Sequence, residues 1–259
     1  MTATPPPALF LSHGSPMLPF EDIPARQFMA ELADSMPRPE AILCVSAHWE
    51  TDRPAVSGAA RPETIHDFYG FPEQLYRLSY PAPGAPDLAR RASQLIEGIT
   101  IDEGQGLDHG AWNPLLLIYP EADIPVAQLS VQLAAGPAHH VDLGRKLAAL
   151  REEGVLILAS GGAVHNLRQF QIDSRKPADW AIAFDQWLGE RIAAGDADAL
   201  IDYKRLRPEA RLAHPREEHF LPLFVALGAG LEGASKGKGR ALHRSFAHGS
   251  LSMAAYAWD

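Results

Sequence analysis

Short apolar runs recur along this chain, and three of them lead directly into a histidine. The three segments read ALFLSH (residues 8–13), AILCVSAH (41–48) and VLILASGGAVH (155–165). Runs of four to six residues rich in Leu, Ile and Val are typical of strands that are buried on both faces of a sheet. Parallel strands bring the residues after their carboxyl ends to one shared edge, where ligands bind. We therefore expect His13, His48 and His165 to converge, which indicates a metal centre.

Helical patterns alternate with these strands. They cover residues 25–35, 85–96, 139–151, 178–193 and 215–227, and further strands are predicted at 124–130, 241–246 and 253–258. Such alternation is typical of βαβ units with right-handed crossovers. No internal repeat or shift of composition divides the sequence. Residues 1–259 are thus predicted to form a single α/β domain, with a central mostly parallel or mixed sheet flanked by helices and the metal site at the carboxyl ends of strands.

Two segments are predicted to lie outside this regular framework. Residues 50–86, rich in Pro, Tyr and Phe, lack clear periodicity, and long structured loops of this kind often bind ligands. Gly228–Arg240 is rich in glycine and is predicted to be a flexible surface loop.

Composition narrows the functional classes. The 259 residues are 46% hydrophobic and 21% charged, as in an ordinary soluble globular protein. A formal net charge of −9 without basic patches argues against a nucleic-acid partner. No run of 18 apolar residues predicts a membrane span, and the first residues lack the pattern of a signal peptide. The single cysteine, Cys44, lies in an apolar run and is expected to be a small core residue, so a cytoplasmic location is expected.

The immediate neighbours of the first two histidines favour fixed side-chain directions. Gly14 and Pro16 make the backbone turn just after His13, which suits a metal ligand or a hydrogen-bonded histidine that caps the loop. His48 is followed by Trp49 and Glu50. Glu50 is expected either to orient the imidazole or to be a solvated charge.

The third histidine follows a pair of glycines. Gly161 and Gly162 allow a close approach of the backbone to a bound group, and Asn166 is expected to cap the helix that follows His165. The alternative is a packed histidine at a helix start.

Residues 214–224 (HPREEHFLPLF) form the densest cluster of candidate ligands. Pro215 suits a first helical turn, so a helix is expected to begin near His214. Burying Glu218 or His219 among apolar neighbours is costly unless the group is paired or binds a metal. One of the two is expected to face the centre and the other to form a salt bridge with Arg216; the pattern leaves open which.

The remaining histidines carry weaker signals. His109, in LDHGAW (residues 107–112), suits either proton transfer or a hydrogen bond that fixes its loop, and His66 is either a pocket residue or a surface histidine. His139, His140, His243 and His248 are expected to be structural or exposed. Nucleotide-binding, metalloprotease and serine-hydrolase motifs are absent from the sequence.

Seven motifs in order resemble one known family. They are Ser12-His-Gly-Ser-Pro-Met17, Ser46-Ala-His-Trp-Glu50, His66-Asp-Phe-Tyr-Gly-Phe-Pro72, Tyr80-Pro-Ala-Pro-Gly84, Asp108-His-Gly-Ala-Trp112, Val164-His-Asn-Leu167 and His214-Pro with Glu218-His-Phe-Leu-Pro-Leu223. Together they resemble the DOPA 4,5-dioxygenase branch of the class III extradiol ring-cleavage dioxygenases. The match runs from about residue 8 to residue 257.

The resemblance implies a single α/β domain that holds one divalent metal, Fe(II) for ring cleavage, with Zn(II) also found in this branch. By motif, His13, His48 and His219 match metal-binding positions. His165 matches either a further ligand or the acid–base residue, and His109 matches a histidine beside the metal. Ring-cleaving sites usually present two histidines and one carboxylate, so either Glu218 or His219 is the third ligand here.

The activity implied is insertion of O₂ into a catechol-type ring, with a small aromatic diol such as DOPA and O₂ as partners. His165 is the expected base, with His109 as a second proton donor. Aromatic residues are expected to line the substrate pocket: Trp49, His66, Phe68, Tyr69, Phe71 and Trp112. A zinc-dependent hydrolase or another metalloenzyme on the same histidines, and a non-enzymatic binding relative, are the alternatives. The sequence leaves open the catechol used, the bond cleaved and the oligomeric state.

Overall fold

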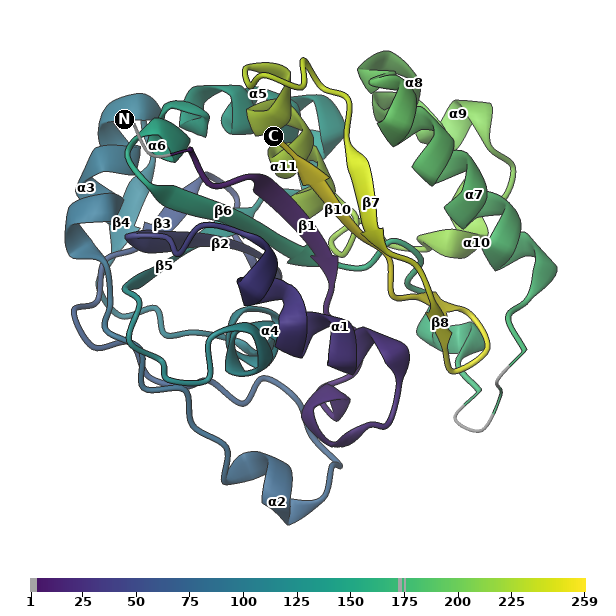
Figure 1. Ribbon diagram of the computed structural model, residues 1–259, viewed down its shortest axis with the longest axis horizontal. Coiled ribbons are helices and arrows are strands. Elements are labelled where there is room, and N and C mark those ends of the chain that lie inside the picture. The colour runs from purple at the N-terminus through teal and green to yellow at the C-terminus, as the bar shows by residue number, and fades with distance from the viewer. Residues whose placement is uncertain (1–3, 172–173, 175) are drawn as a thin grey trace.

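Four buried strands run parallel through the centre of the structure (Figure 1): β1 (Ala8–Ser12), β2 (Ala41–Glu50), β5 (Val126–Val131) and β6 (Val155–Gly161). They lie in the order β5-β2-β6-β1, and all residues of β1, β5 and β6 are buried. The computed structural model describes residues 4–171, 174 and 176–259. The apolar runs of the sequence therefore form strands that are buried on both faces of the sheet, as their composition predicts.

Short strands extend this core to an eight-stranded mixed sheet, which confirms the predicted fold class. On one side β10 (Ala255–Trp258) pairs antiparallel with β1, and β7 (Arg240–His243) follows it. On the other side β3 (Ala55–Ser57) pairs antiparallel with β5, and β4 (Thr100–Asp102) pairs parallel with β3. A separate hairpin joins β8 (Phe246–Ala247) to β9 (Leu251–Ser252).

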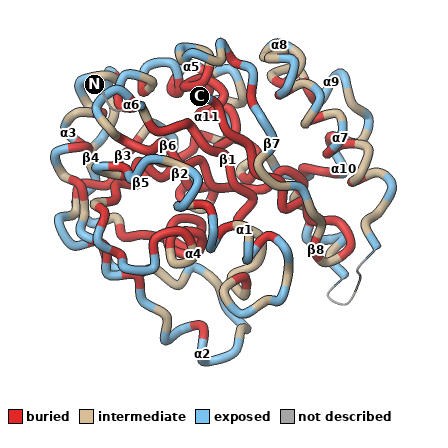
Figure 2. Tube along the Cα trace, in the orientation of Figure 1, coloured by how far each residue is buried: buried red, intermediate tan, exposed pale blue. Residues whose placement is uncertain are grey.

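Helices cover both faces of the sheet (Figure 2). One face packs against α3 (Pro86–Leu95), α5 (Gly136–Leu147), α6 (Ala149–Glu152), α7 (Asp179–Ala194) and α11 (Leu221–Leu231). The other packs against α1 (Pro24–Leu32), α2 (Glu73–Tyr76) and α4 (His109–Ile118). Short helices complete the chain: α8 (Ala197–Ile201), α9 (Tyr203–Leu206), α10 (Ala210–Ala213) and 3₁₀ turns at Leu18–Phe20, Ala33–Ser35, Leu133–Ala135 and Leu167–Gln169. None of the helices in the described part of the chain is long and apolar enough to cross a membrane.

Alternate residues of β2 divide between the two cores, as the pleat of a strand requires. Leu43 and Val45 belong to the α5–α11 side, whereas Ile42 and Cys44 face the α1–α4 side. Cys44 is fully buried, and burial raises the pKa of its thiol well above the usual value. It is thus the small core residue that the sequence predicted.

Two glycines let α5 and α11 pack backbone against backbone. A Cβ on Gly144 of α5 would lie 2.1 Å from the carbonyl oxygen of Val225, and one on Gly228 of α11 would lie 2.1 Å from that of Val141. Glycine costs about 1 kcal/mol in a helix interior relative to alanine, so the close approach explains why glycine is present at both positions.

Gly228→Ala is expected to lower the free energy of unfolding by about 1–3 kcal/mol, the usual cost of overpacking. The clash with backbone atoms outweighs the better helix propensity of alanine. Urea denaturation followed by circular dichroism measures the change. Gly189→Ala in α7 is the matched control, because its Cβ would meet only ordinary contacts, 3.5 Å from the Tyr256 hydroxyl. A Gly228→Ala protein as stable as the control variant would contradict the packing argument.

The structure corrects two predicted elements. The helix predicted over residues 215–227 begins only at Leu221, with Pro222 in its first turn, and residues 214–220 form turns instead. Pro215 therefore does not mark a helix start. The loop predicted at Gly228–Arg240 is also too long, because its first residues are the buried end of α11.

Candidate metal centre

Histidines from five separate segments meet at the carboxyl edge of the parallel strands. His13 follows β1, His48 lies near the end of β2, His165 follows β6, His109 begins α4, and His219 precedes α11. The ring centroids of His13, His48 and His219 lie 4.8–5.2 Å from one another. The expected convergence is therefore present, and the strand order that places β2, β6 and β1 side by side produces it.

Three of these imidazoles direct nitrogens to a common point. One nitrogen from each of His13, His48 and His219 lies within 4.8 Å of the other two, and the Nε2 atoms of His13 and His48 are 3.1 Å apart. Two nitrogens that each lie about 2.0–2.1 Å from one ion are about 2.8–3.4 Å apart at octahedral to tetrahedral angles. The spacing of His13 and His48 fits a shared metal ligand sphere.

A hydrogen bond fixes the tautomer of His13. The Ser160 hydroxyl donates to the carbonyl oxygen of Gly110 at 2.5 Å, so its lone pair accepts the Nδ1–H of His13 at 2.9 Å. The Nε2 atom of His13 therefore carries the lone pair and faces His48. The two Nε2 atoms are within hydrogen-bond distance at 3.1 Å, and a bound cation would take the place of the proton between them.

Glu218 and His219 have different positions. The Nδ1–H of His219 donates to the Glu218 carboxylate at 3.0 Å, which leaves Nε2 of His219 for the centre. Glu218 in turn lies 3.3 Å from the guanidinium of Arg216, the salt bridge expected from the sequence. The geometry thus favours His219 over Glu218 as the third ligand, with the carboxylate behind it as in many histidine metal sites.

Glu50 does not orient His48. Its carboxylate forms two hydrogen bonds with Arg216, at 2.5 and 2.6 Å. The carboxylate nearest Nδ1 of His48 is instead that of Asp67, at 3.4 Å. The sequence reading overlooked Asp67, although it lies in the loop that follows His66.

Burial keeps the central imidazoles neutral. Desolvation, followed by the neighbouring imidazoles, holds the pKa of His13 and His219 well below 6.5, and desolvation likewise lowers the pKa of His48. Neutral imidazoles present lone pairs at neutral pH, so protons do not compete with a metal.

His165 lies beside this trio. Its ring stacks on that of His219 with centroids 3.5 Å apart and planes within 7°. Its ring nitrogens form no hydrogen bond with any other described residue, and burial lowers its pKa to about 4, with a smaller contribution from His109. Asn166 accepts a hydrogen bond from the backbone N–H of Arg168, the cap predicted for the next helical turn. His165 is therefore neutral and unpartnered in the described structure, as a base should be.

His109 pairs with Asp67 and not with its sequence neighbour Asp108. Both the Nδ1–H and the backbone N–H of His109 donate to the Asp67 carboxylate, each at 2.9 Å. Asp108 caps α4 by accepting from the backbone N–H of Ala111, and it also accepts the Ser46 hydroxyl. Burial raises the pKa of Asp108 to about 6, partly offset by the Ser46 bond. Asp108 is thus a structural cap.

The aromatic residues predicted to line a pocket differ in how far they are buried and in what they contact. Trp112 is fully buried and donates its indole N–H to the carbonyl of Ile65, while Trp49 is 8% exposed. His66 donates its Nε2–H to the carbonyl oxygen of Leu78 at 3.0 Å. Phe68 contacts both His66 and His109, and its ring lies 5.6 Å from that of His109. These placements leave Phe68 as the aromatic side chain best situated to meet a ring.

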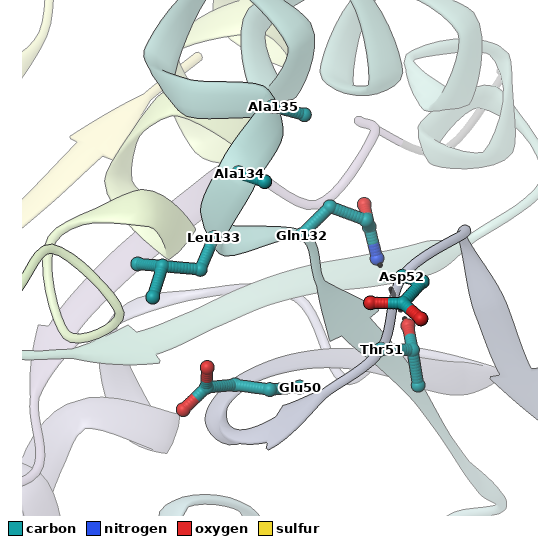
Figure 3. Close-up of a pocket in the computed structure, with 7 residues that line it drawn as sticks. All are labelled: Glu50, Thr51, Asp52, Gln132, Leu133, Ala134 and Ala135. Carbon is teal, nitrogen blue, oxygen red and sulfur yellow. Dashed lines mark hydrogen bonds between the residues drawn. The ribbon is translucent and has the colours of Figure 1, made fainter.

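A surface cavity of about 560 Å³ lies at the ends of β2 and β5 (Figure 3). Its lining residues are Glu50, Thr51, Asp52, Gln132, Leu133, Ala134 and Ala135. In Figure 3 the Gln132 amide points toward Thr51, to which it donates a hydrogen bond. Glu50 lines the cavity and pairs with Arg216, which also pairs with Glu218. These contacts connect the cavity to the histidine cluster.

Comparison with known proteins decides the family. The family model described as the catalytic LigB subunit of aromatic ring-opening dioxygenase matches residues 7–257. The chain belongs to this LigB family. Its membership confirms the resemblance inferred from the seven motifs, and it identifies the chain as an enzyme of the aromatic ring-opening dioxygenase class.

Curated LigB-family relatives share the whole domain. The chain is 44% identical over 255 residues to a protein of Beta vulgaris named 4,5-DOPA dioxygenase extradiol, covering 95% of this chain and 94% of the relative. A protein of the same name from Escherichia coli K12 is 44% identical over 237 residues, covering 88% and 87%. The crystal structure of uncharacterized protein JW3007 from Escherichia coli K12 superimposes with a TM-score of 0.82 at 35% identity, covering 98% of this chain and 100% of that one.

Proposed function

We propose that this LigB-family chain is a metal-dependent extradiol dioxygenase that inserts O₂ into a catechol-type, DOPA-like ring beside its two hydroxyl groups. One observation carries the proposal: three neutral imidazoles, two of them buried and that of His48 partly buried, direct ring nitrogens at one point, in a chain whose relatives are named 4,5-DOPA dioxygenase extradiol. The partners proposed are the small aromatic diol and O₂. The cytoplasmic location and the lack of a nucleic-acid partner stay predictions from the sequence.

His13, His48 and His219 would hold the metal through Nε2. Because all three are imidazoles, the donor set suits Zn(II) as well as Fe(II). A divalent ion held there supplies a Lewis acid that lowers the pKa of a coordinated hydroxyl and, as Fe(II), the redox chemistry that O₂ requires. We propose Fe(II) for ring cleavage.

His165 is the proposed base that accepts a proton from the catechol. Its pKa of about 4 keeps it neutral, and its free ring nitrogens lie beside His219. His109 is the proposed second acid–base group, since Asp67 holds its Nδ1–H and leaves Nε2 for the substrate side. The loop residues His66 and Phe68 would position the catechol ring, and Trp112 packs against both of them.

Oxygen uptake tests this function. The metal-free protein, reconstituted with Fe(II) without oxygen and then given L-DOPA and O₂, is expected to consume one O₂ per catechol and to form a yellow ring-opened product. An oxygen electrode and the visible spectrum measure both. Zn(II) is the matched control, because it fills the same ligands without redox chemistry. Absence of uptake with several catechols, together with hydrolytic activity of the Zn(II) form, would instead support a zinc hydrolase.

A further inference from the structure

One carboxylate contacts two of the clustered histidines at once. Asp67 lies 2.9 Å from Nδ1 of His109 and 3.4 Å from Nδ1 of His48. The rings of these two histidines lie 3.9 Å apart, closer than any other pair in the cluster except His165 and His219. The carboxylate accepts both the backbone N–H and the Nδ1–H of His109, as an acceptor without a proton of its own can.

The loop that carries Asp67 is fixed to the body of the domain. The backbone N–H of Ile65 donates to the carbonyl of Leu107, and the N–H of Leu107 donates to the carbonyl of Glu63, each at 2.8 Å. The Trp112 indole adds a third bond, to the carbonyl of Ile65. These bonds bracket the segment just before α4, so the carboxylate has a fixed place relative to His109.

An anion at this place selects one tautomer of each imidazole. A carboxylate accepts hydrogen bonds and donates none, so it favours Nδ1–H on both rings. On His48 this favours the form whose Nε2 lone pair is free for a metal over the form that donates Nε2–H to His13 at 3.1 Å. The lone pair of His109 is likewise at Nε2, where it can take or return a proton.

We infer that Asp67 is a positioning residue, whose single carboxylate sets the tautomers of both His48, a proposed metal ligand, and His109, a proposed proton carrier. The inference rests on the proposed metal centre and extends it to a loop residue outside the proposed ligands His13, His48 and His219. Carboxylates behind histidine ligands typically raise metal affinity 10–100-fold. Through this one carboxylate, the loop of residues 63–72 would affect both metal binding by His48 and proton transfer by His109.

Two substitutions of Asp67 separate tautomer control from loop support. In Asp67→Asn the amide N–H₂ takes the place of a carboxylate oxygen and donates, which demands an Nδ1 lone pair and moves the ring proton to Nε2. In Asp67→Ala water can hydrate both Nδ1 atoms, and neither tautomer is forced. Tautomer control therefore predicts that Asn is at least as harmful as Ala. Mere support of the loop predicts the opposite order, because Asn can still accept the backbone N–H of His109.

The readout is Co(II) affinity, measured by chelator competition and by the visible d–d spectrum, with no turnover involved. Asp67→Asn is expected to bind Co(II) about 10–100-fold more weakly than the parent protein, with a changed spectrum. Glu73→Gln is the matched control, since Glu73 is an exposed carboxylate of α2 that pairs with Arg77 at the surface. Its Co(II) affinity is expected to stay unchanged.

Asp67→Asn in a His109→Ala background tests direct action on His48. A further loss of Co(II) affinity there supports it, whereas no further loss would overturn that part of the inference. Parental affinity and spectrum in Asp67→Asn itself would overturn the whole. If the parent protein binds no Co(II) at this site, the proposed function fails and not merely the role of Asp67. Thermal melting of the metal-free variants checks that each one is folded.

Discussion

Replacing His13 with alanine is expected to empty the metal site and to abolish ring cleavage. His13 is fully buried, and its Nε2 lies 3.1 Å from that of His48. Two remaining imidazoles hold a divalent ion far more weakly than three. Metal content by elemental analysis should fall from about one ion per chain to below about a tenth, and O₂ uptake should fall by at least about 10³-fold.

His243→Ala is the matched control for this loss. His243 is a half-buried histidine of β7 that bonds Ser245 and stacks on Phe28, remote from the cluster in the sheet order. Its metal content should stay at the parental level. Full occupancy in purified His13→Ala would contradict the ligand assignment, whatever the activity.

Replacing His165 with alanine is expected to lower turnover by about 10²–10⁴-fold, the usual contribution of general acid–base catalysis. The metal should remain, because the three converging nitrogens belong to His13, His48 and His219. The ring of His165 instead stacks on that of His219 and presents free nitrogens. Steady-state kinetics should therefore show a fall in kcat with a much smaller change in KM, at an unchanged Fe(II) content.

The outcomes for His165→Ala distinguish the two roles that its position allows. Loss of Fe(II) along with activity would make His165 a fourth ligand. Unchanged turnover would remove it from the mechanism altogether. His165→Gln keeps a polar group of similar size, so partial recovery of substrate affinity without recovery of kcat would agree with a lost proton carrier.

The site residues that follow strands were predictable from the sequence, because a strand is recognised from the apolar pattern of neighbouring residues. Apolar runs fix β1, β2 and β6, and parallel pairing then carries His13, His48 and His165 to one edge. The segment of residues 214–224 offered Glu218 and His219 as alternative candidates, and the resemblance matched His219 to a metal-binding position. The segment that carries His219 forms turns ahead of α11 where the pattern predicted a helix, because the helix begins at Leu221, with Pro222 and not Pro215 in its first turn.

Side-chain partners were less predictable, since they depend on contacts between segments distant in the chain. Asp108 precedes His109 in sequence, yet Asp67 is 42 positions away and forms the bond. Ser160 fixes His13 from 147 positions away. Glu50 is close to His48 in sequence and was considered as its partner, but Glu50 pairs with Arg216, 166 positions along the chain. Which carboxylate stands behind which imidazole follows from the tertiary structure alone.

The spread of the three proposed ligands along the chain has a thermodynamic consequence. His13 and His48 come from the first third of the chain and His219 from the last third, so an unfolded chain cannot offer them together. An ion bound there would favour the native state by RT ln(1 + [M]/Kd), which is about 4 kcal/mol at a free concentration 1,000 times Kd. The ion would reversibly hold together segments more than 200 residues apart. The metal concentration in the cell would then change the stability of the folded protein.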